Sequence, residues 1–185
     1  MKFIIGGLRF FQIIFSAVIL GLSINLAKGQ AVGKVPATTG YGSFTGAFGI
    51  IAGTIGVAAI FVELLDGVIS WVIDILAALI TVASGIAFTL ALKGTNCGSV
   101  VTLYDKSVLN CGTVEYQGTT FWTCGAQNSN GKEEIKSAVD SIESRCRMAT
   151  ADEVFMYMTF AVVVAALVVS FMNKRRKGAS TNYVI

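Results

Sequence analysis

Long apolar runs alternate with short polar connectors along the chain. Four runs approach or exceed 20 residues, and together they hold two charged residues, Arg9 and Asp74: residues 8–27, 41–62, 68–92 and 154–172. A helix needs about 20 mostly apolar residues to cross the hydrocarbon core of a bilayer. The pattern therefore predicts an all-α membrane protein, a four-transmembrane-helix bundle.

The composition supports a membrane protein of one small domain. Of the 185 residues, 54% are hydrophobic and 14% are charged, and the mean hydropathy is +0.71. A soluble domain carries about 25% charged residues, so this chain has too few polar groups to coat a water-facing surface. We expect a four-span domain over residues 1–173, with a long loop at 93–153, and a basic tail over residues 174–185.

The first run could also be read as a secretory signal peptide. Two features favour a retained span: Arg9 interrupts its start, and its apolar length exceeds the usual signal core of about 7–15 residues.

Basic residues near the span ends predict the orientation. The fourth span is followed directly by Lys174, Arg175, Arg176 and Lys177. Lys2 and Arg9 flank the first span, whereas Lys28 and Lys34 in the first connector weakly oppose the assignment. We expect both termini in the cytoplasm and the loops 28–40 and 93–153 to be extracellular.

All four cysteines lie in the long loop, at Cys97, Cys111, Cys124 and Cys146. An even number of cysteines on the oxidising side of the membrane predicts a disulfide-bonded extracellular loop between helices 3 and 4, with three possible pairings. The alternative of four free thiols remains, whereas a zinc site lacks C-x-x-C pairs and histidine. Within this loop, Val100–Tyr104 and Thr119–Thr123 have strand-like composition, and Lys132–Arg147 has helical periodicity.

Glycines recur on one face of the second span. They step by four, three, four and three residues: Gly42, Gly46, Gly49, Gly53 and Gly56. Small residues let helix backbones approach closely in lipid. The row therefore predicts a helix-packing face, for a helix of this chain or of a partner, rather than a ligand groove.

The charges inside the spans predict a polar pair. In the expected orientation, Arg9 and Asp74 both lie one to two turns from the cytoplasmic side, and Gln12 follows Arg9 by one turn. An ionisable group in a span is costly and usually has a partner. A proton or ion relay is the functional alternative, but the mid-membrane levels offer only serine and threonine.

Several function classes lack their residues. The chain has no histidine, which removes the commonest general base and metal ligand. No phosphate-binding loop or carboxylate pair facing a cleft is evident, and the dense basic cluster adjoins a span. We expect no enzyme, no cofactor, no metal and no nucleic-acid partner.

Short motifs carry a resemblance to a known family. They include Leu8-Arg9-x-x-Gln12 and Gly21-Leu22-Ser23 in the first span, Val72-Ile73-Asp74 in the third, and Ser144-Arg145-Cys146 before the fourth. With four spans and a basic tail, the chain resembles the MARVEL superfamily of membrane-associating four-helix proteins. Within it, the chain looks most like the fungal group that includes yeast non-classical export protein 2.

This resemblance implies a non-enzymatic organiser of plasma-membrane nanodomains of the eisosome type. Its partners would be sterol- and sphingolipid-rich membrane, other membrane proteins or itself. Residues 174–177 are placed to contact anionic lipids of the inner leaflet. The alternative is an accessory subunit of a larger plasma-membrane enzyme or transporter, and a small transporter using Asp74 is a third reading.

Overall fold

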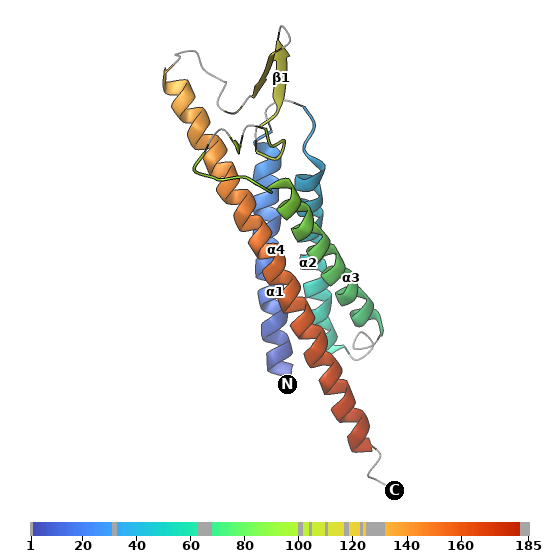
Figure 1. The fold of residues 1–185 in the computed structure, drawn as a ribbon. Coiled ribbons are helices and arrows are strands. Elements are labelled where there is room, and N and C mark those ends of the chain that lie inside the picture. The colour runs from blue at the N-terminus through green and yellow to red at the C-terminus, as the bar shows by residue number, and fades with distance from the viewer. Residues whose placement is uncertain are drawn as a thin grey trace.

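The structure is a computed structural model that describes residues 2–30, 33–62, 68–99, 102–103, 105–109, 111–116, 119–122, 124 and 132–181. These residues form four helices and one hairpin (Figure 1): α1 (Lys2–Lys28), α2 (Ala37–Phe61), α3 (Val68–Ala91), β1 (Thr113–Tyr116), β2 (Thr119–Trp122) and α4 (Lys132–Thr181).

The helices run side by side as an elongated bundle (Figure 1). Helix α1 packs against α2 and α4, and α3 packs against the same two neighbours. The hairpin lies at one end of the bundle, which we call the loop end. Helix α1 begins, and α4 ends, at the opposite end, which we call the tail end.

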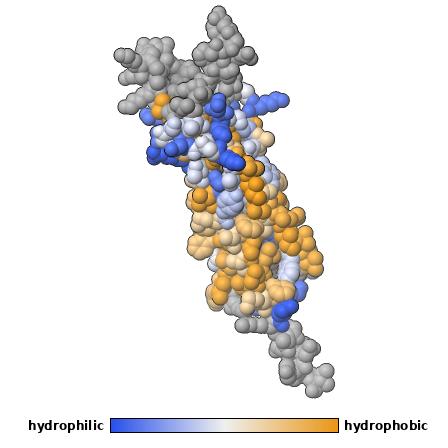
Figure 2. All heavy atoms as spheres, in the orientation of Figure 1, coloured by the Kyte–Doolittle hydropathy of each residue, from blue (hydrophilic) through white to orange (hydrophobic). Residues whose placement is uncertain are grey.

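The lateral surface of the bundle is apolar. Figure 2 shows a broad hydrophobic band along the bundle, with hydrophilic residues gathered toward the loop end. Large side chains such as Ile51, Leu79 and Leu90 are more than half exposed on this band. All four helices are long and apolar enough to cross a membrane. The predicted four-helix membrane bundle is confirmed.

Local sequence explains where two helices begin or end. Pro36, with an extended ψ of 138°, precedes Ala37, and its carbonyl accepts a helical hydrogen bond from Gly40 N at 3.1 Å. The fixed φ of proline suits this entry into a helix. Gly94 follows the end of α3 with a φ of +78°, which is the left-handed conformation that commonly stops a helix.

Helix α4 is longer than a span requires. Its 50 residues correspond to about 75 Å, whereas the hydrocarbon core is about 30 Å thick. The helix predicted over Lys132–Arg147 therefore continues without a break into the span predicted at 154–172. No glycine or proline interrupts residues 132–177, so nothing in the sequence stops the helix between these two parts.

The loop between α3 and α4 packs onto the end of the bundle. Leu103, Val108 and Leu109 are buried in one apolar cluster with Leu26 of α1 and Ile142 of α4. Both cysteines of each disulfide belong to the cluster or lie against it. The loop thus closes the bundle with its own small core.

The hairpin corresponds in part to the predicted strands. Strand β2 covers the predicted segment 119–123 except its last residue, and it pairs antiparallel with β1. The strand predicted at Val100–Tyr104 is wrong at the described residues, because Thr102 and Leu103 lie in a turn. The Thr102 hydroxyl donates to Ser99 O at 2.9 Å, a local bond that competes with strand pairing.

Candidate functional sites in the bundle

The glycine face of α2 lies directly against α1. All five glycines are buried. From the loop end to the tail end, they face Ser23, Leu20, Ser16, Ile13 and Arg9 of α1 in order. The two helices are antiparallel, so each later glycine of α2 faces an earlier residue of α1. This face is therefore covered within the chain.

The close approach of the two helices depends on the missing side chains. A Cβ added to Gly46 would lie 2.5 Å from the backbone nitrogen of Leu20, and one added to Gly53 would lie 2.6 Å from Ile13 Cγ1. Real Cβ atoms essentially never come so close to other heavy atoms. Backbone cannot move aside as a flexible side chain can, so Gly46 is the position of this interface where an added side chain is hardest to accommodate.

Arg9 of α1 and Asp74 of α3 form an ion pair across the interior. Their side chains are only 2% and 3% exposed. Arg9 Nη1 donates to Asp74 Oδ1 at 2.5 Å, and Nη2 donates to Oδ2. Arg9 Nη1 also donates to Gln12 Oε1 at 2.9 Å. The structure thus brings these three residues together, with two parallel bonds of the kind that make arginine–carboxylate pairs strong.

The ion pair also involves the glycine face. A Cβ at Gly56 would overlap the guanidinium and Cδ of Arg9. Arg9 therefore fills the space that Gly56 leaves open, while its charge reaches α3. One arginine joins α1, α2 and α3 at the same level near the tail end.

A second buried carboxylate lies nearer the loop end. Ser23 Oγ of α1 donates to Asp152 Oδ2 of α4 at 2.5 Å, and both residues are fully buried. Sequence reasoning missed this pair because it placed Asp152 in the loop. The available signal was the spacing of buried positions in α4, which continues through the boundary at 154: Ile142, Cys146, Ala149, Asp152, Met156, Thr159, Val163 and Ala166.

Apolar side chains and a few hydroxyl groups fill the bundle between the two polar levels. Ala77 of α3 and Val163 of α4 lie between these levels along their helices and are buried in an apolar cluster with Ala52 of α2. Thr81 and Thr159 bond to carbonyls of their own helices. A relay requires a succession of polar groups through the membrane, and between Asp74 and Asp152 the buried polar groups among the described residues are serine and threonine hydroxyls, such as those of Ser16 and Ser84.

Two disulfides fix the loop end. Cys97 bonds to Cys146, and Cys111 bonds to Cys124. The first joins the start of the loop to α4, and the second closes the segment that contains the hairpin. The sequence left three pairings open, and the structure has this one.

Arg145 ties the loop to two helices and was not singled out for this role. Its side chain is buried, and its hydrogen bonds to described residues all go to backbone carbonyls: Leu109 O at 3.0 Å, Val108 O at 3.2 Å and Leu26 O at 3.0 Å. Leu26 lies in the last turn of α1, where a positive charge complements the helix dipole. Arg145 thus joins α4, the loop and α1.

The tail end carries cations over aromatic rings. Trp71 of α3 and Phe171 of α4 have ring centroids 5.6 Å apart. Lys174 Nζ lies 5.8 Å from the Trp71 ring, and Arg175 Cζ lies 4.7 Å from the Phe171 ring. Arg176 and Lys177 continue α4, but their side chains lie outside the described part of the chain.

An apolar groove lies between α1 and α2 at the tail end. It encloses about 800 Å³ and is lined mainly by Gly6, Gly7, Phe10, Ile60 and Phe61. A Cβ at Gly7 would meet no atom within 4 Å. Phe10 and Phe61 of its lining are exposed, so the groove is open to the outside of the bundle.

The described residues hold no group of three or more histidine, cysteine or acidic side chains that could bind a metal ion. All four cysteines are bonded in pairs, so none offers a thiolate. The acids that the structure buries, Asp74 and Asp152, bond to Arg9 and Ser23.

Comparison with known proteins gives one result. The profile of the membrane-associating domain, MARVEL, matches residues 2–169. No curated protein and no solved structure matches the chain.

Proposed function

Because the chain belongs to the MARVEL family of membrane-associating domains, we propose that it organises lateral nanodomains of the plasma membrane without catalysing a reaction. It does so by packing side to side with lipids, with other membrane proteins and with copies of itself. By similarity to the fungal group, the domains are of the eisosome type and rich in sterol and sphingolipid.

One observation carries this proposal. Inside the bundle, Arg9 is paired with Asp74 and Asp152 accepts a hydrogen bond from Ser23, while the lateral surface carries exposed large apolar side chains on all four helices. A reaction or a transport pathway needs polar groups that substrate can reach. Here the accessible surface at membrane depth is suited to contacts with lipids and other helices.

Internal packing supports a rigid body with its contact surface outside. The glycine face of α2 is used by α1, so it is not free for a partner helix. Lateral contacts must then use exposed aliphatic and aromatic side chains, such as Phe44, Ile51 and Leu79. The groove between α1 and α2 adds a hollow on this surface.

The tail end supplies contacts to anionic lipid. We assign it to the cytoplasmic side, where each basic residue near the surface contributes about 1 kcal/mol of attraction to the anionic leaflet. Lys174 and Arg175 hold their charged groups over the Trp71 and Phe171 rings, in cation–π contacts that keep these charges at the tail end of the bundle. The disulfide-bonded loop end and loop 28–40 are then extracellular, on the oxidising side.

An accessory subunit of a larger enzyme or transporter is the second candidate. The observation that favours it is the extension of α4 beyond the other helices at the loop end (Figure 1). Together with the disulfide-fixed loop, this part could dock on a partner's outer domain. If the chain is instead a scaffold that organises nanodomains, as proposed first, the loop end needs no partner protein.

Gentle extraction of the full chain with its native lipids separates the two candidates. Size measurement and mass spectrometry should find assemblies of this chain with lipid, and their size should fall when lipid is stripped. One large enzyme or transporter at fixed stoichiometry, retained after lipid is stripped, would contradict the scaffold proposal and favour the accessory subunit.

A further inference from the structure

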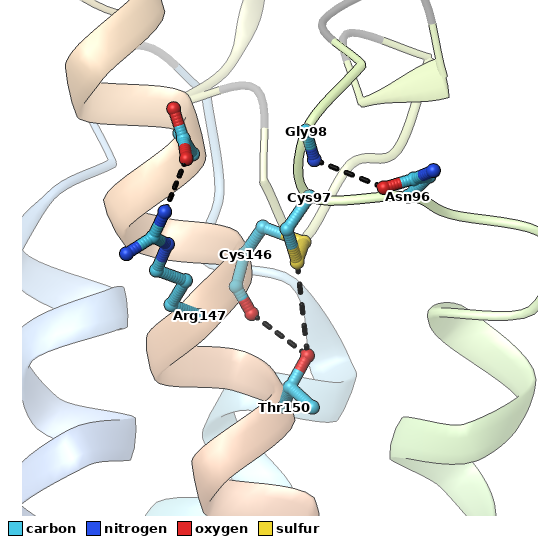
Figure 3. A network of polar contacts seen from close by, with 7 residues as sticks. Asn96, Cys97, Gly98, Cys146, Arg147 and Thr150 are labelled. Carbon is cyan, nitrogen blue, oxygen red and sulfur yellow. Dashed lines mark hydrogen bonds and ion pairs between the residues drawn. A yellow bond between two sulfur atoms is a disulfide. The ribbon is translucent and has the colours of Figure 1, made fainter.

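A small pocket lies beside the first disulfide, on the outer face of α4 at the loop end. It encloses about 410 Å³ and is lined by Cys97, Arg147, Thr150, Ala151, Val154 and Phe155. Figure 3 shows Cys146 and Thr150 on the side of α4 that faces the loop residue Cys97, with Arg147 extending from the other side of the same helix. The pocket is distinct from the groove and the basic cluster at the tail end.

The disulfide builds the wall of this pocket. Cys97 is bonded to Cys146 and so holds the start of the loop against α4. Cys97 Sγ lies 3.9 Å from Thr150 Oγ1, and Thr150 donates to Cys146 O at 3.0 Å. On the loop side, Asn96 Oδ1 accepts from Gly98 N at 3.0 Å (Figure 3). The pocket is thus held by covalent and local bonds.

The chemistry of the lining changes along α4. Arg147 lies at the upper end with a side chain 74% exposed. Thr150 and Ala151 follow one turn later, and Val154, 50% exposed, and Phe155 follow after another turn. From Val154 to Met172 the helix carries no charged residue. The pocket therefore spans the boundary between the polar end of the bundle and the part that lipid tails cover.

Arg147 keeps donors free for a ligand. Its Nη2 forms an exposed ion pair with Glu143 Oε1 at 2.5 Å, whereas a guanidinium carries five N–H donors. An exposed pair of this kind contributes at most about 1 kcal/mol. A phosphate can use the remaining donors or replace Glu143, since arginine binds phosphate with two parallel bonds.

We propose that this pocket binds a phospholipid of the leaflet at the loop end. Arg147 binds the phosphate, the Thr150 turn lies beside the glycerol, and one acyl chain follows Val154 and Phe155 into the bilayer. A free phosphate ion would use Arg147 but leave the apolar half of the pocket uncovered. This inference deepens the proposed lateral association with lipids and rests on the chain spanning a membrane.

The test compares two lipids that share their acyl chains. The full chain, purified in detergent, is titrated with dioleoylphosphatidylglycerol or with dioleoylglycerol, which lacks the phosphate, and bound lipid is counted by native mass spectrometry. We expect the phospholipid to bind about tenfold more tightly than dioleoylglycerol, because hydrogen bonds to charged groups are stronger than neutral ones.

Matched variants locate the site. Arg147→Gln should lower phospholipid affinity about tenfold, whereas Lys93→Gln, which removes the same charge from an exposed position at the same end, should leave it unchanged. Glu143→Gln should raise affinity, because it frees Arg147. Equal affinities for R147Q and K93Q, or equal binding of the two lipids, would overturn the proposal.

Two further outcomes also decide against it. Displacement of the phospholipid by inorganic phosphate would show an anion site without a lipid chain. If a second protein co-purifies with the chain, stays bound after the lipid is removed and no longer binds the R147Q variant, the pocket is a protein docking site. Because the readout is binding in detergent, failure here leaves the separate test of nanodomain organisation intact.

Discussion

Arg9 and Asp74, 65 positions apart in the sequence, form a doubly hydrogen-bonded ion pair inside the four-helix bundle. They join α1 and α3, which lie diagonally opposite in the ring of helices. The pair fixes the relative height of these helices because both hydrogen bonds form only at one register.

Removal of one partner of this pair should destabilise the bundle more than removal of both. Arg9→Met or Asp74→Leu leaves a buried charge unpaired, which costs about 3–5 kcal/mol. The double variant replaces both charges with apolar groups and should recover most of that loss. Unfolding of each variant in detergent measures the coupling, and additive losses would mean that the pair does not act as a unit.

Gly46→Ala should separate α2 from α1. The added Cβ would lie 2.5 Å from the backbone nitrogen of Leu20, and overpacking of this kind costs about 1–3 kcal/mol. Gly40→Ala is the matched control, because a Cβ there meets nothing within 4 Å. That change should be neutral or stabilising by up to about 1 kcal/mol. Similar melting temperatures for G46A and G40A would contradict the described interface.

Replacement of Arg145 should destabilise the protein much more than replacement of Arg147, although only one residue separates the two. Arg145→Gln removes hydrogen bonds to three buried carbonyls and should cost about 2–4 kcal/mol. Arg147→Gln removes an exposed ion pair worth at most about 1 kcal/mol. Hydrogen exchange should increase over residues 102–109 in R145Q alone. Equal exchange in both variants would show that Arg145 does not hold the loop.

Single cysteine variants should release specific thiols. Cys97→Ser should free Cys146, and Cys111→Ser should free Cys124, since these are the bonded pairs. Maleimide labelling of the denatured, unreduced protein, followed by peptide mass mapping, identifies the free cysteine. Labelling of Cys111 or Cys124 in C97S would show a different pairing.

The basic tail should attract anionic lipid. Simultaneous Lys174→Gln, Arg175→Gln, Arg176→Gln and Lys177→Gln should reduce the enrichment of fluorescent phosphatidylserine around the reconstituted protein at least about tenfold, given about 1 kcal/mol per charge. The control removes four lysines outside the tail: Lys28, Lys34, Lys93 and Lys106. Equal enrichment for the two variants would indicate that net charge, rather than the tail, attracts the lipid.

The sequence alone predicts features that repeat with the period of a helix and residues whose depth in the membrane can be counted along a span. Apolar length alone predicts four spans, because the hydrocarbon core sets the helix length. The glycine row is visible since a helix repeats every 3.6 residues, and close packing against another helix follows from its small residues, although the sequence did not show that this helix is α1. Arg9 and Asp74 could be matched because each lies at a definable depth within its span.

Features that depend on tertiary contacts were not accessible. Within the described part of the chain, Arg145 donates to backbone carbonyls. Every residue type has such a carbonyl, so the sequence offers no particular residue as its partner. Asp152 seemed to lie in a loop because charges near it ended the apolar run, although the helix continues through it. The disulfide pairing depends on how the loop folds over Leu26 and Ile142, and residue spacing alone cannot choose between three pairings.

The central claim, that this chain itself organises membrane domains, is tested most directly by imaging it alone. The fluorescently labelled full chain is reconstituted into giant vesicles that contain no other protein, either of phosphatidylcholine alone or with sterol, sphingolipid and phosphatidylserine added. The account predicts concentrated protein patches, enriched in the added lipids, in the mixed vesicles and an even distribution in phosphatidylcholine. An even distribution in both kinds of vesicle would contradict it.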